Sequence, residues 1–298
     1  MNRPDLKHLI ADELAQPVDP RVSDAAAAIA ALYPGARAVL FYGSCLRTGE
    51  IDGQMLDFYL IVRDYREAYG KRWLAWANRL IPPNVFPFER NGVAAKYAVL
   101  SEDHFLRECS VSARSPSVWA RFAQPVRQVW SADENAATLA LNAISRAPGT
   151  LLELVRPTLS DDAARDVLEI WRQGFRLTYG AELRAERSDR PDSIVDQSPE
   201  RYRAIAFAAG FPRDIGLDEA GTEVFRRAWR HHQRRGKRLT LLRLAKASLT
   251  FAGGVDYLAW KINRHASAGI VVKPWQRRHP LLGALILLPR LLRRGAVR

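Results

Sequence analysis

Residues 39–62, VLFYGSCLRTGEIDGQMLDFYLIV, constrain the possible fold of this chain more than any other segment. Two apolar runs of strand length flank the pair Gly43-Ser44, and Asp57 lies inside the second run. A carboxylate within an apolar strand is costly unless it is paired with a cation or binds a metal. A Gly-Ser turn allows backbone N–H groups to approach a phosphate. The segment therefore predicts a β-sheet site where a phosphate group and a metal ion are held.

Length and composition indicate a folded chain with one or two domains. The chain has 298 residues, of which 48% are hydrophobic, and eight are tryptophan. Cys45 and Cys109 have no metal-type spacing, so we expect reduced thiols in a cytosolic protein. The N-terminal residues contain no apolar stretch of the kind found in secretory signals, so no such signal is expected.

The hydrophobic pattern predicts an α/β (α+β) fold with a mixed sheet. Strands are expected at 36–42, 55–62 and 92–100. Helices are expected at 5–33, 64–77, 132–146, 161–187, 198–209, 217–234 and 229–249. Loops are expected around Pro82, Pro83 and Pro87 and over 187–200. We therefore predict a catalytic α/β domain over 1–130, a helical domain over 131–224 and a basic amphipathic region over 225–298.

The spacing between Ser44 and Asp57 resembles that of the polymerase-β-like nucleotidyltransferases. In that superfamily the serine and nearby amides hold a nucleoside triphosphate, and strand carboxylates hold Mg²⁺. A second carboxylate usually follows two residues after the first, and here that position is Tyr59. The pair Gly43-Ser44 could instead be a plain strand-end turn, and Asp57 a buried aspartate satisfied by neighbouring backbone.

Four blocks resemble, in the same order, the mitochondrial-type phosphatidate cytidylyltransferases, the translocator assembly and maintenance family. They are YGSCLRTGEIDGQMLDFYLIVRD (42–64), NGVAAKYAVLS (91–101), WARFAQPVRQV (119–129) and LTYGAELR (177–184). The departures are Ala98 for glycine, Gln124 for lysine and Glu182 for aspartate. The change at Gln124 weakens the case for phosphate binding at that position.

The resemblance implies the residues of a site. Nucleotide binding would fall to Tyr42, Gly43, Ser44, Tyr179, Glu182 and Arg184. Asp57 and Lys96 would be catalytic, with Asp57 holding Mg²⁺ and Asp64 as its second metal ligand. Lys96 could also be an ordinary surface lysine, and Tyr179 and Glu182 an exposed pair on one helix face.

The positive charge of the chain is concentrated at its C-terminal end. Residues 225–298 contain eighteen Lys or Arg and one acid, Asp256, whereas the rest carries 27 basic and 31 acidic residues. Such a region needs a polyanion. The eight apolar residues Leu281–Leu288 are too few to span a bilayer, but with Trp275 and flanking arginines they suit a membrane surface.

These observations lead to one functional hypothesis and two alternatives. The hypothesis is a Mg²⁺-dependent enzyme that transfers CMP from CTP to phosphatidate and is bound peripherally to the cytoplasmic face of the inner membrane. The first alternative is an RNA- or tRNA-directed nucleotidyltransferase, because basic segments also bind nucleic acid. The second is a nucleotide-binding member of the superfamily without catalytic activity.

Overall fold

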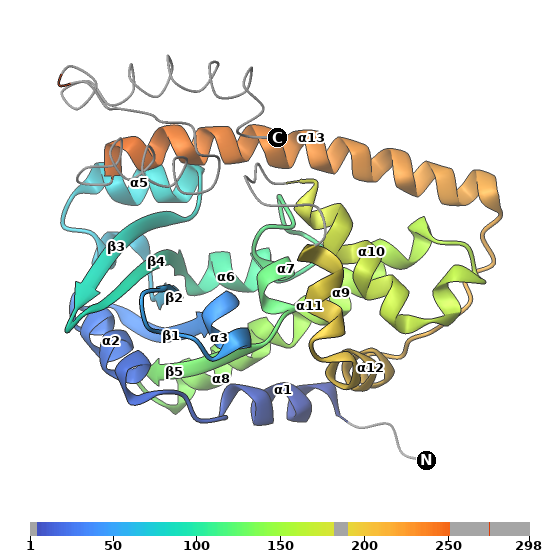
Figure 1. Ribbon diagram of the computed structural model, residues 1–298. Coiled ribbons are helices and arrows are strands. Elements are labelled where there is room, and N and C mark those ends of the chain that lie inside the picture. Colours follow the sequence, from blue (N-terminus) through green and yellow to red (C-terminus); the bar gives the residue numbers. More distant parts are fainter. Residues whose placement is uncertain (1–4, 182–189, 251–273, 275–298) are drawn as a thin grey trace.

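A five-stranded mixed sheet forms the centre of the molecule (Figure 1). The computed structural model describes residues 5–181, 190–250 and 274. The strands are β1 (Ala36–Tyr42), β2 (Met55–Val62), β3 (Asn84–Arg90), β4 (Val93–Ser101) and β5 (Val126–Ser131). Their order across the sheet is β3-β4-β2-β1-β5, in which β2 and β4 are parallel and the other pairs antiparallel. The predicted fold class is confirmed.

Two helical layers cover the two faces of the sheet. One face packs against α2 (Pro20–Ala31), α4 (Tyr65–Ala68) and α5 (Arg72–Leu80). The other face packs against a larger set of helices. This set comprises α1 (Leu6–Leu14), α6 (Glu102–Glu108), α7 (Trp119–Phe122), α8 (Glu134–Ile144), α9 (Arg146–Val155), α10 (Val167–Tyr179) and α12 (Pro199–Ala208). Because β2 lies between both layers, its sequence is apolar almost throughout.

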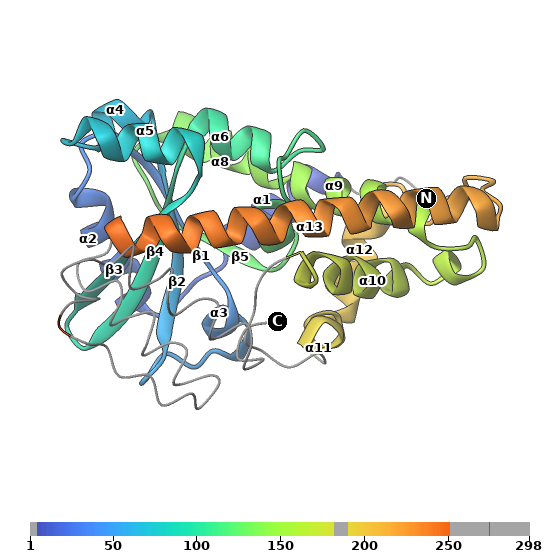
Figure 2. The same ribbon diagram turned by 90° about the horizontal axis from the view of Figure 1, so that it is seen from above.

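Four shorter elements complete the chain. They are α3 (Ser44–Thr48), α11 (Arg190–Asp196), and the 3₁₀ turns Arg156–Thr158 and Ala163–Arg165. The last helix, α13 (Glu219–Thr250), has 32 residues and runs along one side of both the helical part and the sheet (Figures 1 and 2). Within the described residues, no helix is both long and apolar enough to cross a membrane.

Side chains along helix α13 bond to the rest of the molecule. The indole Nε1 of Trp229 donates to the carbonyl of Leu154 at 2.8 Å. Further along, the guanidinium of Arg243 donates to the carbonyl of Pro82 at 2.7 Å and to the hydroxyl of Ser117 at 2.9 Å. The expected helices 217–234 and 229–249 are parts of this one continuous helix.

The helix expected at 64–77 is broken, and this prediction is corrected. Asp64 caps α4 by accepting from the amides of Arg66 and Glu67, and Tyr69 then adopts an extended conformation before Gly70. The segment contains four aromatic residues at helical spacing, Tyr65, Tyr69, Trp73 and Trp76. Because the chain changes direction at Tyr69, they do not share one helix face. Tyr65 and Tyr69 are buried, whereas Trp73 and Trp76 are exposed.

Two expected loops contain regular structure. Residues 84–90 form β3, an edge strand, where Pro87 is tolerated because an edge has a side that needs no donor. Residues 190–196 form α11. The expected helix 5–33 is interrupted at 15–19, around Pro17, and the helix expected at 161–187 starts only at Val167.

The hydrophobic core does not stop at the boundary placed at residue 130, which lies inside β5. One cluster joins Leu40 and Tyr59 of the sheet to Trp171 and Tyr202 of the helices. The described parts of the first two predicted domains therefore share a core.

Candidate functional site

Asp57 and Lys96 lie side by side on the parallel strands β2 and β4. They are register partners, and Lys96 Nζ is 2.7 Å from Asp57 Oδ1. Their side chains are partly accessible, 19% for Asp57 and 29% for Lys96. Side chains alternate along a strand, so both point to the face that carries Tyr59 and Ala98. The ammonium group stabilises a carboxylate that the apolar strand would otherwise leave uncompensated.

Gly43 passes directly beside this carboxylate. Its φ of +97° is a conformation that residues with a side chain rarely adopt. A Cβ at this position would lie 3.1 Å from Asp57 Oδ2 and 3.3 Å from Asp57 Cβ. The Gly43-Ser44 pair is therefore more than a plain strand-end turn, because it brings the backbone of Gly43 against Asp57.

Cys45 lies behind the turn and is buried. Its Sγ lies 3.6 Å from the carbonyl of Met55 and donates to it. Burial, and then the negative charge of Asp57, raise the pKa of the Cys45 thiol. A thiol held in its protonated form is a poor nucleophile, so Cys45 packs the turn and is not a reactive group of the site.

The position where the superfamily usually has its second carboxylate is occupied by a packed aromatic ring. Tyr59 is 3% exposed, with its ring centroid 5.3 Å from that of Tyr42 and 5.1 Å from that of Phe122. Tyr42, predicted to bind nucleotide, is therefore part of an aromatic cluster at the border of the site. It is also the register partner of Asp57 on β1.

A second cation was missed by the sequence analysis. Arg47, one helical turn after Ser44 on α3, donates from Nη1 to Gln124 Oε1 at 3.0 Å. Gln124 precedes Val126, the partner of Tyr42 on β5, so this contact lies towards β5, whereas Lys96 lies on β4. The arginine in SCLRTG, close behind a Gly-Ser turn, was the signal that could have identified it.

Asp64 does not belong to this site, and its prediction as a metal ligand beside Asp57 is corrected. Its carboxylate accepts from the backbone amides of Arg66 and Glu67 at 2.6 and 3.0 Å, and these bonds lower its pKa. Asp57 is near the start of β2 and Asp64 follows its end. Seven residues of extended chain span roughly 23 Å, too far for a shared ion.

The structure describes one of the three predicted residues from the helical part. Tyr179 ends α10, is half-buried and packs against the hydrophobic cluster that contains Tyr202. Glu182 and Arg184 lie outside the described residues.

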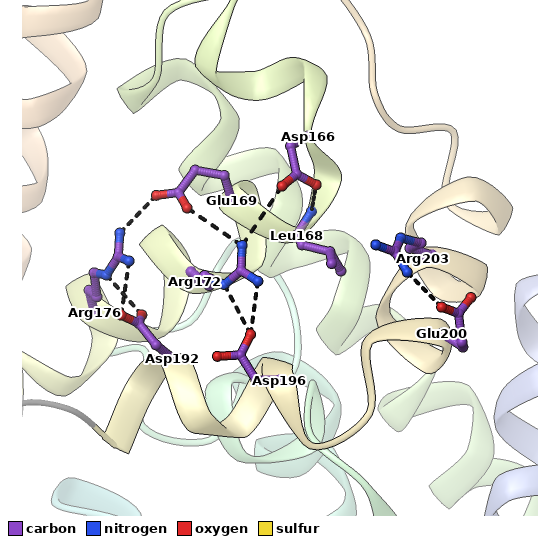
Figure 3. Close-up of polar contacts among 9 residues, drawn as sticks. All are labelled: Asp166, Leu168, Glu169, Arg172, Arg176, Asp192, Asp196, Glu200 and Arg203. Carbon is purple, nitrogen blue, oxygen red and sulfur yellow. Dashed lines mark hydrogen bonds and ion pairs between the residues drawn. The ribbon is translucent and has the colours of Figure 1, made fainter.

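An ion-pair network fixes α11 against α10 on either side of residues 182–189 (Figure 3). Arg176 lies 2.9 Å from Asp192 and 2.8 Å from Glu169, and Arg172 lies 2.8 Å from Asp196. These pairs are partly exposed, so each contributes little, but together they hold two helices in register. In both views α11 lies on the same side of the molecule as α3 (Figures 1 and 2).

Asp57 can supply one ligand for Mg²⁺. Within the described residues, no group of three His, Cys, Asp or Glu could enclose a metal ion. Mg²⁺ in proteins is often held by one or two carboxylates together with substrate phosphates. The described residues therefore fit an ion that arrives with a nucleotide and do not fit one held by protein ligands alone.

A separate basic cavity borders α13. Its described lining is made of four side chains on one side of the helix, His231, Arg234, Arg235 and Arg238, and its volume is about 530 Å³. These side chains are exposed. Neighbouring His232 has a lowered pKa, because of burial and then the charge of Arg235. The cavity is suited to an anionic group.

The comparisons with known proteins give little further information. No family model matches the chain, and no curated protein matches it. Among solved structures, it is similar to a nucleotidyltransferase-like protein from Exiguobacterium sibiricum, with 10% identity, a TM-score of 0.31 and 92% of each chain covered.

Proposed function

We propose that this chain is a nucleotidyltransferase that transfers CMP from CTP to phosphatidate, forming CDP-diacylglycerol and pyrophosphate. The observation that carries the proposal is the Asp57–Lys96 pair, 2.7 Å apart, held against the backbone of Gly43. A carboxylate, a cation and a glycine turn are the groups that a metal-bound triphosphate needs. The choice of CTP and phosphatidate rests on the sequence resemblance.

The proposed reaction is an in-line displacement at phosphorus. A phosphate oxygen of phosphatidate forms a bond to the α-phosphorus of CTP, and the bond from that phosphorus to the bridging oxygen breaks. Pyrophosphate leaves with the electron pair. Because the attacking phosphate is already an anion at neutral pH, no general base is required, and positioning with charge neutralisation dominates.

The charged side chains of the site would act by balancing the negative charge of the triphosphate. Asp57 repels a triphosphate unless a cation lies between them, so Lys96 or a metal ion must occupy that space. Mg²⁺ bound through Asp57 would neutralise phosphate charge. Arg47, which contacts Gln124 on the side towards β5, would bind the same phosphates through its guanidinium group.

The lipid acceptor requires a place at a membrane. We propose peripheral attachment to the cytoplasmic face of the inner membrane, through the basic residues of 225–298. Exposed cations on α13, including Arg234, Arg235 and Arg238, support this part of the proposal. Each Lys or Arg near an anionic surface contributes roughly 1 kcal/mol.

The decisive experiment incubates the full chain with each labelled nucleoside triphosphate, Mg²⁺, vesicles containing phosphatidate and added RNA, and then separates the lipid from the RNA. We expect label in the lipid fraction from CTP, and loss of that label in Asp57→Asn at unchanged thermal stability. Wild-type turnover in Asp57→Asn would exclude the assigned role of Asp57. Label on added RNA instead of lipid would favour the RNA-directed alternative.

One observation favours a second candidate, a nucleotide-binding protein without turnover. The position two residues after Asp57, where the superfamily usually has its second carboxylate, is filled by the buried Tyr59. Calorimetry measures CTP binding, and the acceptor assays measure product. CTP binding without a metal-dependent product in any acceptor assay would support the non-catalytic candidate.

A further inference from the structure

Helix α5 exposes two tryptophans on its outer face. Trp73 is 47% exposed, Trp76 is 68% exposed and Leu80 is 56% exposed. Positions 73, 76 and 80 are three and four residues apart, so they share one side of the helix. Large aromatic side chains are seldom left in water without a partner.

The inner face of α5 prevents these side chains from turning inwards. Ala75 and Asn78 are buried, and the Asn78 amide donates to the carbonyl of Val99 at 2.9 Å and to the hydroxyl of Tyr69 at 3.1 Å. A buried amide with two such bonds fixes the rotation of the helix. The tryptophans are therefore held outwards by the fold itself.

Cations surround the exposed tryptophans. Lys71, Arg72 and Arg79 are exposed on the same short segment, and none of them makes an ion pair with any residue in the described ranges. Between Glu67 and Glu89 the sequence contains no acid. The outer face of α5 thus combines indole rings, an aliphatic side chain and uncompensated positive charge.

We propose that the outer face of α5 docks on an anionic bilayer, with Trp73, Trp76 and Leu80 in the headgroup region. Tryptophan favours the membrane–water interface because its ring is apolar and its N–H can remain hydrated. Lysine and arginine beside it attract anionic lipid. A protein partner would need an acidic rim to match this face, whereas an anionic bilayer matches it without further specificity.

The end of α13 reaches the same part of the molecule. Lys246 is buried and donates to the carbonyl of Pro83 at 2.9 Å and to that of Ile81, and Arg243 donates to Pro82. These carbonyls belong to the loop that directly follows α5. The described end of the basic helix α13 therefore lies close to α5.

The test places a fluorescent reporter on α5. Cys45 and Cys109 are both buried, so a dye whose emission shifts in an apolar medium can be directed to Trp76→Cys or Leu80→Cys in the full chain. Phe207→Cys on α12, 51% exposed, is the matched control. With vesicles of phosphatidylcholine and phosphatidylglycerol we expect a blue shift at 76 and 80 and none at 207.

A second measurement compares vesicle sedimentation. The double variant Trp73→Ala/Trp76→Ala should weaken partitioning roughly tenfold, whereas Phe207→Ala should not change it. Vesicle-bound protein without a shift at 76 and 80 would overturn the inference, and so would absence of vesicle binding. A shift already present without vesicles would show that the chain itself, or a second copy, covers α5, and would also overturn it.

The inference shares its partner with the proposed function, and in that respect it rests on it. The α5 inference and the proposed function can be refuted separately, because the reporter measures membrane contact and not turnover. A blue shift on vesicles without CMP transfer would leave the α5 surface standing and remove the enzymatic proposal. CMP transfer to lipid without a blue shift would support the enzymatic proposal and exclude the α5 surface as a membrane contact.

Discussion

A side chain at position 43 would have to displace the carboxylate of Asp57, since its Cβ would lie 3.1 Å from Oδ2 at a φ of +97°. We predict that Gly43→Ala lowers stability by about 1–2 kcal/mol and lowers turnover by roughly 10²-fold, because Asp57 is displaced. Gly53→Ala is the control: φ is +67°, but nothing lies within 4 Å. Its stability should fall similarly while its activity remains. Equal activities of the two variants in a CTP turnover assay would contradict the assigned site.

Arg47 allows a separate test of the phosphate contact. If it binds the triphosphate, Arg47→Ala should raise KM for CTP by roughly 10–100-fold, with a smaller effect on kcat. The contact with Gln124 suggests a rescue, because Arg47→Ala/Gln124→Lys returns a cation to the same place. Recovery of KM in the double variant, measured by steady-state kinetics, is the expected result. An unchanged KM in Arg47→Ala would remove Arg47 from the site.

The sequence was sufficient to predict part of this site. Asp57 was identifiable because a carboxylate stands out in an apolar strand, and Gly43 because a glycine at a strand end indicates a special turn. Lys96 could be suspected, but its pairing with Asp57 depends on the parallel register of β2 and β4, which the sequence does not specify. Arg47 and Gln124 are 77 positions apart, so only the fold brings them together.

The contact between α4 and α6 should make the stability of the protein depend on pH. Tyr65 Oη lies 2.9 Å from His104 Nδ1, and burial, followed by the charge of Arg107, lowers the pKa of His104 to about 4. The unfolded value is higher, near 6.5, so the unfolded chain binds more protons between these values. The contribution of His104 to the free energy of unfolding should therefore be fully present above pH 6.5. It should be lost as the pH falls towards 4.

The size of this effect is limited because His104 is half-buried. We expect a loss of about 1–2 kcal/mol after allowance for solvent screening. Urea denaturation of the wild type and of His104→Gln at several pH values measures it, and the difference between the two should shrink across this window. A difference that does not depend on pH would exclude His104 as the titrating group.

At the scale of elements, the sequence predicted types better than boundaries. The predicted ends of the apolar strands β1, β2 and β4 lie at or near the observed ends, because each apolar run is long and unambiguous. The helix predicted at 64–77 is broken at Tyr69 and Gly70, although its four aromatic residues, Tyr65, Tyr69, Trp73 and Trp76, recur at helical spacing. Pro87 led to a predicted loop where β3 lies, since a proline is compatible with a strand only at the edge of a sheet, and edges are set by tertiary order.

At the scale of the whole molecule, one core and one long helix join the sheet to the helical part. Leu40 and Tyr59 belong to the same hydrophobic cluster as Trp171, Tyr202 and Trp229. The division of the sequence into a catalytic and a helical domain followed the change from predicted strands to predicted helices near residue 130. That pattern does not show that the two parts bury their apolar faces against each other, because this is decided by packing.

Trp229 offers a test of this continuity. It is 5% exposed, its ring lies edge-on to Trp119 with centroids 6.3 Å apart, and it bonds to Leu154. Trp229→Ala should cost about 3–5 kcal/mol, and Val224→Ala, which removes a 63% exposed side chain from the same helix, about 0.5 kcal/mol or less.

If the described parts share one core, urea unfolding of Trp229→Ala should remain a single transition with a lower midpoint, seen equally by circular dichroism and tryptophan fluorescence. Separate cores would respond differently, because loosening α13 would uncouple the sheet from the helices and split the transition in two. Coincident curves therefore support a single cooperative unit, in which α13 stabilises the site by holding the helical layer against the face that carries Asp57 and Lys96. Two resolved transitions would instead favour the division into two domains that the sequence pattern predicts.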